Sequence, residues 1–509
     1  MRRLAGGVRG LLPVLPFFLL TLLPLAWLLG TVSWEGAKAP VWGREGLLLG
    51  RTLLYGTAVA SSAVLLAYLA LVFGAFTPWV DRGLLKAFLF LALPVPGTVF
   101  AYAGLKALGL LGLPSRGFAP SWLVHTASLL PVALFILATG LHTLKKEPLH
   151  AARLLGSDAR MLARILPGML APQVLAALGT VFLLSVGDYA IPSIFSINVY
   201  SLGIFVEYSS SLSLGSTLVK SAPLVLLQAL VLLLLLGRTE PLFLTGGRKG
   251  MLTLELSLPG TLLAAGGLLL GLALLLVLLP FLLVLTDLAM WRGLPQTLAR
   301  SGRDLAASLG ILFRAGILAL PVSYLGGWWL HSLRKGRRPA LFLVLLPAFL
   351  PGSLTGAALI HLYNRPCTSG LYDSLWMPAL AVLARFLPLS LLVVHASFRR
   401  LDRELVDAAF LLHPSRLKAH LQVLLPLVLP GLALGTAFLL LFGLGELGAT
   451  VLVLPPGSST VTVRLYNYLH YGASEEVLGL SFLLLAGMGG ILGAAGLLSG
   501  LARRLRKMD

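Results

Sequence analysis

The stretch that decides the fold class is LVLLQALVLLLLL, residues 224–236, in which Gln228 is the only polar residue. A membrane-spanning β-strand would alternate polar and apolar residues, and this run shows no alternation. A helix that is apolar on every side lies either in the core of a large protein or in a membrane. The run therefore predicts a helix, and the rest of the chain decides between these two surroundings.

The composition of the whole chain favours the membrane. Of its 509 residues, 58% are hydrophobic and 11% are Asp, Glu, Lys or Arg, and the mean hydropathy is +0.93. A soluble domain is about 25% charged, so these charges are too few to cover a water-facing surface. The composition excludes a soluble enzyme, a disordered chain and a fibrous protein. The one cysteine, Cys367, excludes an intrachain disulfide framework and a cysteine-rich metal site.

Twelve stretches are apolar over about the 20 residues that a spanning helix needs. They lie near residues 10–30, 52–74, 87–111, 122–143, 168–190, 221–237, 259–287, 306–330, 341–363, 377–398, 428–452 and 474–500. We therefore predict an all-α polytopic membrane protein with about twelve transmembrane helices. A cleavable signal peptide is the alternative for the first stretch, but Pro40 after the cleavage-like Ala37-Lys38-Ala39 argues against it.

The basic residues sort onto alternate loops. With the N-terminus inside, 26 Lys and Arg residues fall on cytoplasmic segments and ten on outer segments. Cytoplasmic loops collect Lys and Arg, so both termini are predicted to be cytoplasmic. The net charge of +20 would suggest a nucleic-acid partner in a soluble protein. Here the membrane explains it, and no nucleic acid is expected.

The chain contains an internal repeat. The segment 147–156 matches 404–413 at an offset of 257, and Gly187-Asp188-Tyr189 matches Gly445-Glu446-Leu447 at an offset of 258. We predict two parallel six-helix repeats, residues 1–245 and 259–509, joined by a cytoplasmic linker at 246–258. Parallel repeats imply a pseudo-twofold axis along the membrane normal, with a solute path between the halves. The alternative is that duplication only builds a larger bundle.

Each half has a long cytoplasmic loop, 147–172 or 404–430, before its fifth span. The loop is predicted to form a short helix, a break and a second short helix that ends at Pro167 or Pro426. Paired alanines give each loop a small face that another surface can approach closely. The loop is therefore either a docking helix for a cytoplasmic protein or a lid over the bundle.

These loops resemble the EAA loop of permease subunits in binding-protein-dependent ABC importers. The matching residues are Glu147, His150, Ala151, Ala152, Gly156 and Pro167 in the first copy, and Glu404, Asp407, Ala408, Ala409, His413 and Pro426 in the second. The resemblance implies the type I ABC importer permease fold in a bacterial inner (plasma) membrane. It also implies a coupling role for both loops, with two copies of a cytoplasmic ABC ATPase and a periplasmic solute-binding protein as partners.

Both copies depart from the family pattern. The first has His150 where the family has an acid, and it reaches Pro167 two residues early. The second has His413 at the position of the family glycine. Histidine tolerates the left-handed backbone conformation better than most residues, so we expect the turn at His413 to persist.

The chain is not expected to be an enzyme or to hold a cofactor. It contains no Gly-x-x-x-x-Gly-Lys-Ser/Thr, so it does not bind ATP through a P-loop, and hydrolysis is expected in the partner ATPase. No convergent catalytic residues are found, and the nine histidines show no i, i+4 pair, so no metal site is predicted. The other functional class is an ion-coupled secondary transporter with two six-span halves, which would not need the duplicated loops.

Acidic residues inside predicted spans are candidates for the solute path. Asp188 and Glu446 occupy matching positions, with Tyr189 beside the first and Asp287 nearby. Acids in a membrane are costly and usually functional, and carboxylate and phenolate oxygens suit a hard cation. The alternative is that each acid pairs with a backbone amide or a buried base and only shapes the bundle.

The fused halves and the region from Gly445 to Tyr466 resemble ferric-iron permeases. That region contains Gly445-Glu446-Leu-Gly-Ala449-Thr450, then Pro455-Pro456-Gly457 and Thr460-Val-Thr-Val-Arg464-Leu-Tyr466. The resemblance implies ferric iron as the solute. Fused thiamine permeases share the layout, and oxyanion permeases share a similar Gly-Glu motif, so thiamine or another small solute is the alternative.

The charge distribution makes a prediction about topology. Reporter fusions at Lys335 and Lys418 should report the cytoplasm, and a fusion at Pro456 should report the outside, because Lys and Arg gather on cytoplasmic loops. The measurement is the paired activity of a cytoplasm-active and a periplasm-active reporter at each site. A cytoplasmic signal at Pro456 would contradict the model of two parallel six-helix halves.

Overall fold

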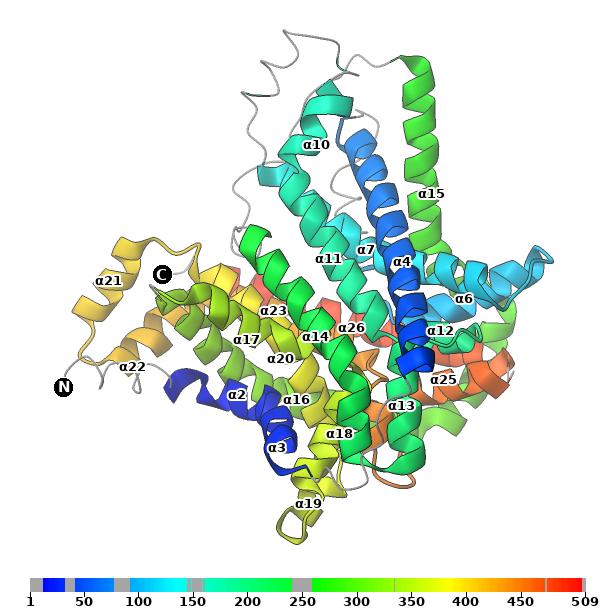
Figure 1. Ribbon diagram of the computed structural model, residues 1–509. Coiled ribbons are helices and arrows are strands. Elements are labelled where there is room, and N and C mark those ends of the chain that lie inside the picture. The colour runs from blue at the N-terminus through cyan, green and yellow to red at the C-terminus, as the bar shows by residue number, and fades with distance from the viewer. Residues whose placement is uncertain are drawn as a thin grey trace.

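The computed structural model describes most of the chain as helices (Figure 1). The described residues are 12–32, 42–76, 92–143, 148, 158, 161–239, 259–333, 335–471 and 474–505. Within these ranges the structure contains no strand. The all-α class is therefore confirmed. The predicted linker at 246–258 lies outside the described residues.

Eight of the twelve predicted spans are confirmed as helices long and apolar enough to cross a membrane. They are α4 (Trp42–Phe76), α7 (Phe118–Thr143), α14 (Leu214–Thr239), α15 (Gly260–Leu285), α16 (Leu288–Ser332), α20 (Trp376–Phe398), α23 (Leu425–Leu444) and α26 (Ser474–Leu505). Together they make the chain a polytopic membrane protein.

The other four predicted spans are shorter or interrupted. They contain α2 (Leu15–Thr21) with α3 (Leu23–Thr31), α6 (Gly97–Leu110), α11 (Ala171–Gly187), and the pair α17 (Arg337–Phe349) and α18 (Gly352–Tyr363). The α17–α18 pair turns by 96° between its two helices and counts as a ninth span if it crosses as one unit. Within the described residues, the predicted count of about twelve thus corresponds to eight long helices and four broken or short ones.

Prolines cause most of these interruptions. Pro24 stands in the first turn of α3, Pro96 directly precedes α6, and Pro351 directly precedes α18. Proline has no N–H to donate, and it forces the residue before it into an extended conformation. Leu350, before Pro351, has φ −64° and ψ 149°, which ends α17. A hydropathy profile shows each of these stretches as one continuous apolar segment, because a single proline hardly changes the mean hydropathy.

Some helix ends differ from the predicted ones. Helix α16 begins at Leu288 rather than 306, because its more polar start, with Arg300 and Asp304, is continuous with the apolar part of the helix. Helix α23 ends at Leu444 rather than 452, since Gly445 closes it.

The segments 161–239 and 420–505 contain the same series of elements. Each begins with a π-helical turn, Met161–Ile165 or His420–Leu424, and continues into the apolar helix α11 or α23. The following elements are α12 (Ala190–Ile194), α13 (Tyr200–Ser211) and α14 in the first, and α24 (Thr450–Val453), α25 (Val461–Tyr471) and α26 in the second. The remaining short helices are α10 (Leu166–Met169), α19 (Ser369–Tyr372), α21 (Arg403–Leu412) and α22 (Arg416–Ala419).

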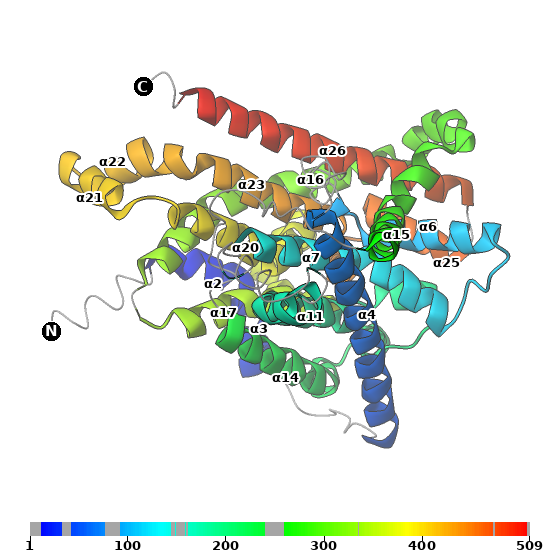
Figure 2. The same ribbon diagram turned by 90° about the horizontal axis from the view of Figure 1, so that it is seen from above.

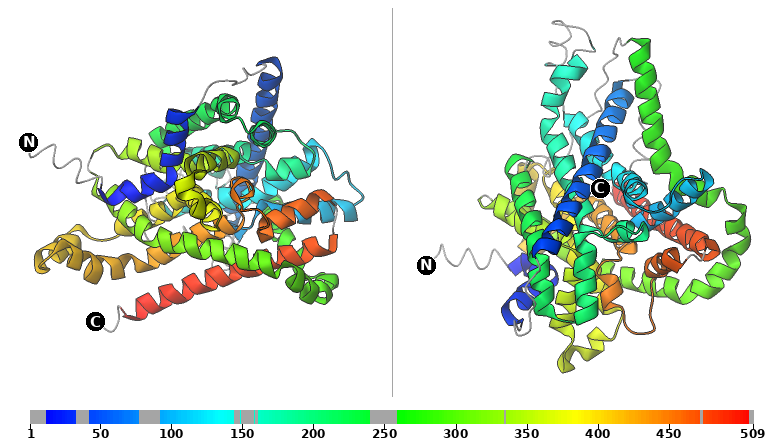
Figure 3. Two further views of the ribbon diagram at one scale, coloured as in Figure 1. Left: turned by 90° about the horizontal axis from the view of Figure 1, so that it is seen from below. Right: turned by 45° about the vertical axis from the view of Figure 1, so that its right-hand side comes forward.

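The first helices of the two predicted halves lie against the opposite half. Helices α2 and α3 pack on α16, α18 and α20, and α15 packs on α4, α6 and α7 (Figures 1 and 2). Helix α15 stands beside α4 in both views, although more than 180 residues separate their starts. Figure 3 shows α2 and α3 beside the green and yellow helices of the later part of the chain. This exchange ties the two parts of the chain together along their length.

Close backbone packing yields a prediction about stability. A methyl group added at Gly352 would lie 2.8 Å from backbone atoms of Gly448, whereas one added at Gly489 would meet nothing within 4 Å. Gly352→Ala should therefore destabilise the protein by about 1–3 kcal/mol, the usual cost of overpacking. Thermal unfolding in detergent measures the effect, with Gly489→Ala as the matched control. Equal unfolding temperatures in the two variants would contradict this packing.

Candidate functional site

Four breaks in helices meet between the two parts of the chain. They are residues 94–97 before α6, 187–190 between α11 and α12, 349–352 between α17 and α18, and 445–450 between α23 and α24. A methyl group added at Gly445 would lie 3.0 Å from Pro96, and one at Gly187 would lie 3.4 Å from the carbonyl oxygen of Phe349. The break after α11 therefore lies against the one between α17 and α18, and the break after α23 lies against the one before α6. We name these four segments the junction.

Asp188 sits at the break after α11 and starts α12. Its Oδ1 accepts a hydrogen bond from the Ala190 amide at 3.0 Å, and its Oδ2 accepts one from the Ile191 amide at 3.2 Å. Such bonds satisfy amides at a helix start that have no partner within the helix. The Nε2 of His125, on α7, lies 3.7 Å from Oδ2. One carboxylate thus caps α12 and lies beside a base from the preceding span.

Glu446 occupies the matching place after α23 and starts α24. Its Oε1 accepts from the Ala449 amide at 2.9 Å, and its Oε2 accepts from the Thr450 amide at 2.8 Å and from the Thr450 hydroxyl. The Nη1 of Arg385, on α20, lies 2.5 Å from Oε1. The Glu446 side chain is fully buried, so these donors take the place of the water that would otherwise solvate its carboxylate.

The two acids therefore make equivalent contacts in the two halves. Each caps the short helix that follows its break, and each has a base on the helix that corresponds to the fourth span, α7 or α20. Helices α7 and α20 also carry internal prolines, Pro131 and Pro388, at the repeat offset of 257. This geometry matches the alternative given above for these acids, in which each pairs with a backbone amide or a buried base and shapes the bundle. Contact of Asp188 and Glu446 with a solute stays a prediction.

Tyr189 lies at the centre of the junction. Its ring stacks on Phe205 with centroids 5.0 Å apart and meets the ring of Tyr466 edge-on at 6.4 Å. The residue is 3% exposed, and its hydroxyl has no hydrogen-bond partner. Asp188, Glu446, Arg385 and Tyr466 all lie within electrostatic reach of that hydroxyl. The structure thus brings the three predicted pathway residues near one another, with Tyr189 and Glu446 buried and Asp188 partly exposed.

A hydroxyl pair closes the junction on the side of α25. The Ser193 and Tyr466 hydroxyl oxygens are 2.8 Å apart and join α12 to α25, one from each half. Burial raises the pKa of the Tyr466 phenol, which keeps it neutral. The seam between the halves is therefore polar at this point without adding a charge.

His125 and Arg385 belong to the site but were not predicted as site residues from the sequence. The available signal was that each is a basic or titratable residue inside a predicted span, where such a side chain needs a partner. Asp287, the other acid considered, forms an ion pair with Lys106 of α6. That pair joins the end of α15 to the first half.

The structure describes one of the two predicted coupling loops. Glu147, His150, Ala151, Ala152 and Gly156 lie outside the described residues, and Pro167 stands in the first turn of α10. In the second loop, Glu404, Asp407, Ala408 and Ala409 lie on α21, His413 follows it, and Pro426 stands in the first turn of α23. The described loop has the predicted order of a helix, a break and a second helical segment. That second segment, however, does not end at Pro426: it continues from Arg416 to Leu444, since the π-helical turn His420–Leu424 leads directly into α23.

The two paired alanines of α21 differ in their exposure. Ala408 is exposed, whereas Ala409 is only 4% exposed and is buried within the chain. Ala409 is therefore covered by the chain itself in this structure, and the coupling role of Ala408 and Ala409 stays a prediction. Leu411 and Leu412 are instead 84% and 81% exposed at the end of the helix. Helix α21 projects from one end of the bundle in Figures 1 and 2.

The turn after α21 does not use a left-handed residue. His413 has φ −104° and ψ 142°, which is extended backbone. Pro414 follows it, and a residue before proline is pushed into the extended region. The predicted left-handed conformation of His413 is therefore wrong, because the proline decides it. The His413 Nδ1 lies 3.1 Å from the Ala409 carbonyl oxygen and closes the helix end.

Both loops end in the same unusual way. The π-helical turns Met161–Ile165 and His420–Leu424 directly precede Leu166-Pro167 and Leu425-Pro426. π-Helical turns are rare and often occur at functional sites. Two of them at matching places indicate that this backbone shape belongs to both copies.

The described residues offer no cluster that suits a metal ion. None of their His, Cys, Asp and Glu side chains come together in groups of three or more. Cys367 is exposed, and Asp188 and Glu446 already accept hydrogen bonds from backbone amides.

Comparisons place the chain near known permeases. No family model matches it. It is 24% identical over 204 residues to the putrescine transport system permease protein PotI of Escherichia coli strain K12, covering 39% of this chain and 67% of PotI. It is 27% identical over 199 residues to the probable sulfate transport system permease protein cysT of Anthoceros angustus, covering 35% and 69%. It is 30% identical over 161 residues to a probable molybdenum ABC transporter permease protein of Haloferax volcanii, covering 30% and 58%. These relatives are all transport permeases, and their named solutes differ.

The Glu446–Arg385 pair yields a prediction about stability. Glu446→Gln leaves the largely buried Arg385 guanidinium without its counter-charge, which should cost about 3–5 kcal/mol of stability. Asp188→Asn should cost less, because the Asp188 side chain is 33% exposed and its base is 3.7 Å away. Thermal unfolding in detergent measures both variants. The double variant Glu446→Gln/Arg385→Met should recover much of the loss, and no recovery would mean that the pair is not the source of it.

Proposed function

We propose that the chain is the transmembrane permease of an ABC import system. The observation that carries this proposal is α21, a projecting helix with Leu411 and Leu412 exposed, placed just before a π-helical turn and the Leu-Pro that starts α23. Exposed leucines outside the spans have neither lipid nor core to cover them, so they suit a protein partner. The transport permeases that the chain resembles support the same function.

The proposed domain organisation is two permease repeats, residues 1–245 and 259–509, with a cytoplasmic linker at 246–258. The matching series of elements in 161–239 and 420–505 supports it, as does the pairing of Pro131 with Pro388. Two repeats offer two docking loops, so two copies of an ABC ATPase are the proposed cytoplasmic partners. A periplasmic binding protein delivers the solute on the other side, and both termini lie in the cytoplasm of a bacterial cell.

The proposed path runs between the halves through the junction. Parallel repeats place a transport site at their interface, and the junction is where the broken spans of both halves meet. The rings of Tyr189, Phe205 and Tyr466 pack together there, so the path is closed at this level in the described arrangement. Closure of the partner ATPases on ATP would move the docking loops and, through α11 and α23, the two acid-bearing breaks.

Ferric iron is the proposed solute, on the resemblance of the Gly445–Tyr466 region to ferric-iron permeases. Because Asp188 and Glu446 are capped, the binding protein sets selectivity and the acids affect rate. Thiamine or another small solute is the alternative, and the named solutes of the relatives include putrescine, sulfate and molybdenum. An ion-coupled secondary transporter has less support, since it gives α21 no partner.

The coupling role of α21 is testable with a matched control. Leu411→Asp/Leu412→Asp should abolish binding of the partner ATPase and solute-dependent ATP hydrolysis, because it places charges in a buried apolar interface. The control is Leu110→Asp/Leu111→Asp at the end of α6, where the leucines are 73% and 71% exposed. Copurification of the ATPase and its solute-stimulated rate are measured. Full coupling in the α21 variant would reject the assignment.

The solute is tested by uptake into vesicles. The permease, reconstituted with its ATPase and binding protein, should import ferric iron in an ATP-dependent way. Asp188→Asn should slow uptake without changing which solute is taken, since this acid is expected to affect only the rate. Import of thiamine or an oxyanion without iron would overturn the solute and leave the permease function standing.

A further inference from the structure

Gln228, the only polar residue of the apolar run 224–236, makes a hydrogen bond between the two halves. Its side chain is fully buried, and its Nε2 donates to the carbonyl oxygen of Phe349 at 2.7 Å. Gln228 lies on α14 of the first half, and Phe349 is the last residue of α17 in the second. A polar side chain on an otherwise apolar membrane helix is costly unless it has a partner. The bond to Phe349 gives Gln228 that partner.

The Phe349 carbonyl needs a partner from outside its own helix. The chain turns by 96° between α17 and α18, and Pro351 has no N–H to donate. The hydrogen bonds of α18 begin at the Pro351 carbonyl, which accepts from the amides of Leu354 and Thr355. A carbonyl left without a partner in a membrane is costly. The bend, which we name the elbow (residues 349–352), therefore depends on a donor from the first half.

Gln228 also touches the acid-bearing break of its own half. A methyl group added at Gly187, the residue before Asp188, would lie 3.2 Å from the Gln228 Nε2 and 3.4 Å from the Phe349 carbonyl oxygen. Three segments thus meet at one amide group: the end of α11, the middle of α14 and the elbow. A displacement of the elbow relative to α14 would break or stretch the Gln228 bond, and the end of α11 packs against both partners of that bond.

The contact occurs on one side of the pseudo-twofold axis only. At the offset of 258 that relates Gly187 to Gly445, Gln228 corresponds to Ala486, whose side chain has no donor. A contact needed only to complete the fold of a repeat would be expected in both copies. The difference points to a role that the two halves do not share.

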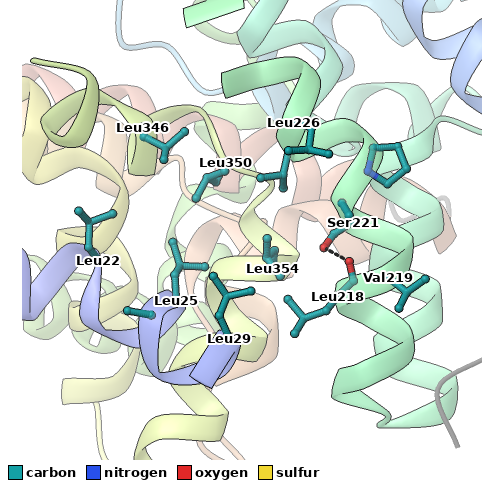
Figure 4. A pocket seen from close by; sticks show the side chains of 14 residues that line it. Leu22, Leu25, Leu29, Leu218, Val219, Ser221, Leu226, Leu346, Leu350 and Leu354 are labelled. Atoms are coloured by element: carbon teal, nitrogen blue, oxygen red, sulfur yellow. Dashed lines mark hydrogen bonds between the residues drawn. The ribbon is translucent and has the colours of Figure 1, made fainter. Parts of the chain in front are cut away.

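The elbow has room to move on its other side. An open apolar groove of about 890 Å³ lies there, lined by Leu346, Leu350 and Leu354 around the elbow, Leu226 of α14 and Leu29 of α3 (Figure 4). Leu226 and Leu29 are 68% and 64% exposed, so the groove opens to the outside of the bundle. Protein interiors are close-packed, so a displacement of the elbow toward the groove meets fewer packed side chains than one into the bundle, where Gly352 packs against the Gly448 backbone.

We infer that Gln228 is a positioning residue that latches the elbow of the second half to the acid-bearing break of the first. This inference rests on the proposed permease function, in which the halves move relative to each other. With the Gln228–Phe349 bond made, the junction is held in its closed arrangement. When the halves separate, the bond breaks and the elbow moves away from Asp188.

The test measures the separation of α14 and α17 by pairs of spin labels. The labels are placed at Leu234→Cys and Leu343→Cys, both on lipid-exposed positions, in a Cys367→Ser background. Gln228→Met keeps the length of the side chain and removes the donor. It should reduce the ratio of the population at the short distance to the population at the long distance about threefold or more, the effect of losing an average hydrogen bond between membrane helices. Leu230→Met on the lipid-facing side of α14 is the matched control and should leave the ratio unchanged.

A second measurement does not depend on any variant at Gln228. In the labelled protein with native Gln228, the distance between α14 and α17 should differ between the nucleotide-free complex and the complex with ATP trapped in its ATPase. An unchanged distance in a complex that binds and hydrolyses ATP would overturn the latch while leaving the permease function intact. An unchanged ratio in folded Gln228→Met would also overturn it. Failure of any ATPase to bind the chain would instead count against the proposed function.

Discussion

A lipid bilayer offers no water to the backbone, so every helix break inside it must find hydrogen-bond partners within the protein. Within the described residues, helices break at four places that meet in the junction, and at three of these a side chain satisfies backbone groups released there. Asp188 and Glu446 accept from the first amides of α12 and α24, and Gln228 donates to the last carbonyl of α17. The polar residues that look out of place in an apolar sequence are the ones that make these breaks possible.

The same constraint brings the two halves together. The elbow takes its donor from α14, Ser193 pairs with Tyr466, and Lys106 pairs with Asp287, each contact joining the halves. Breaks are the places where a membrane helix can bend, and polar contacts between halves can exchange partners with small displacements. We therefore regard the junction as both the weak point of the fold and the proposed solute path.

The sequence predicted the long helices well because apolar length alone defines them. It predicted the interrupted spans poorly, because proline leaves the hydropathy high while it stops the helix, as at Pro351. The extended backbone of His413 could have been predicted from Pro414 alone. The burial of Ala409 and the exposure of Ala408 could not, since both are alanines and only the packing of α21 on its neighbours distinguishes them.

Asp188, Tyr189 and Glu446 were predicted from the sequence, but their arrangement in the site was not. Matching positions of Asp188 and Glu446 in the two copies indicated that they belong together. Their capping contacts depend on breaks whose geometry no residue pattern gave, and neither His125 nor Arg385 was assigned to the site from the sequence. The equivalence of the two caps required the coordinates, because the partner bases lie on different turns of α7 and α20.

The central claim, that the junction lies on an alternating path, is tested most directly by the accessibility of Tyr189. In a Cys367→Ser background, Tyr189→Cys is exposed to a membrane-impermeant thiol reagent from either side of reconstituted vesicles, with and without trapped ATP. We expect labelling from one side only in each state, with the accessible side changing on ATP binding. A cysteine that stays unreactive from both sides in every state of an active complex would contradict it, because the junction would then be only a packed core.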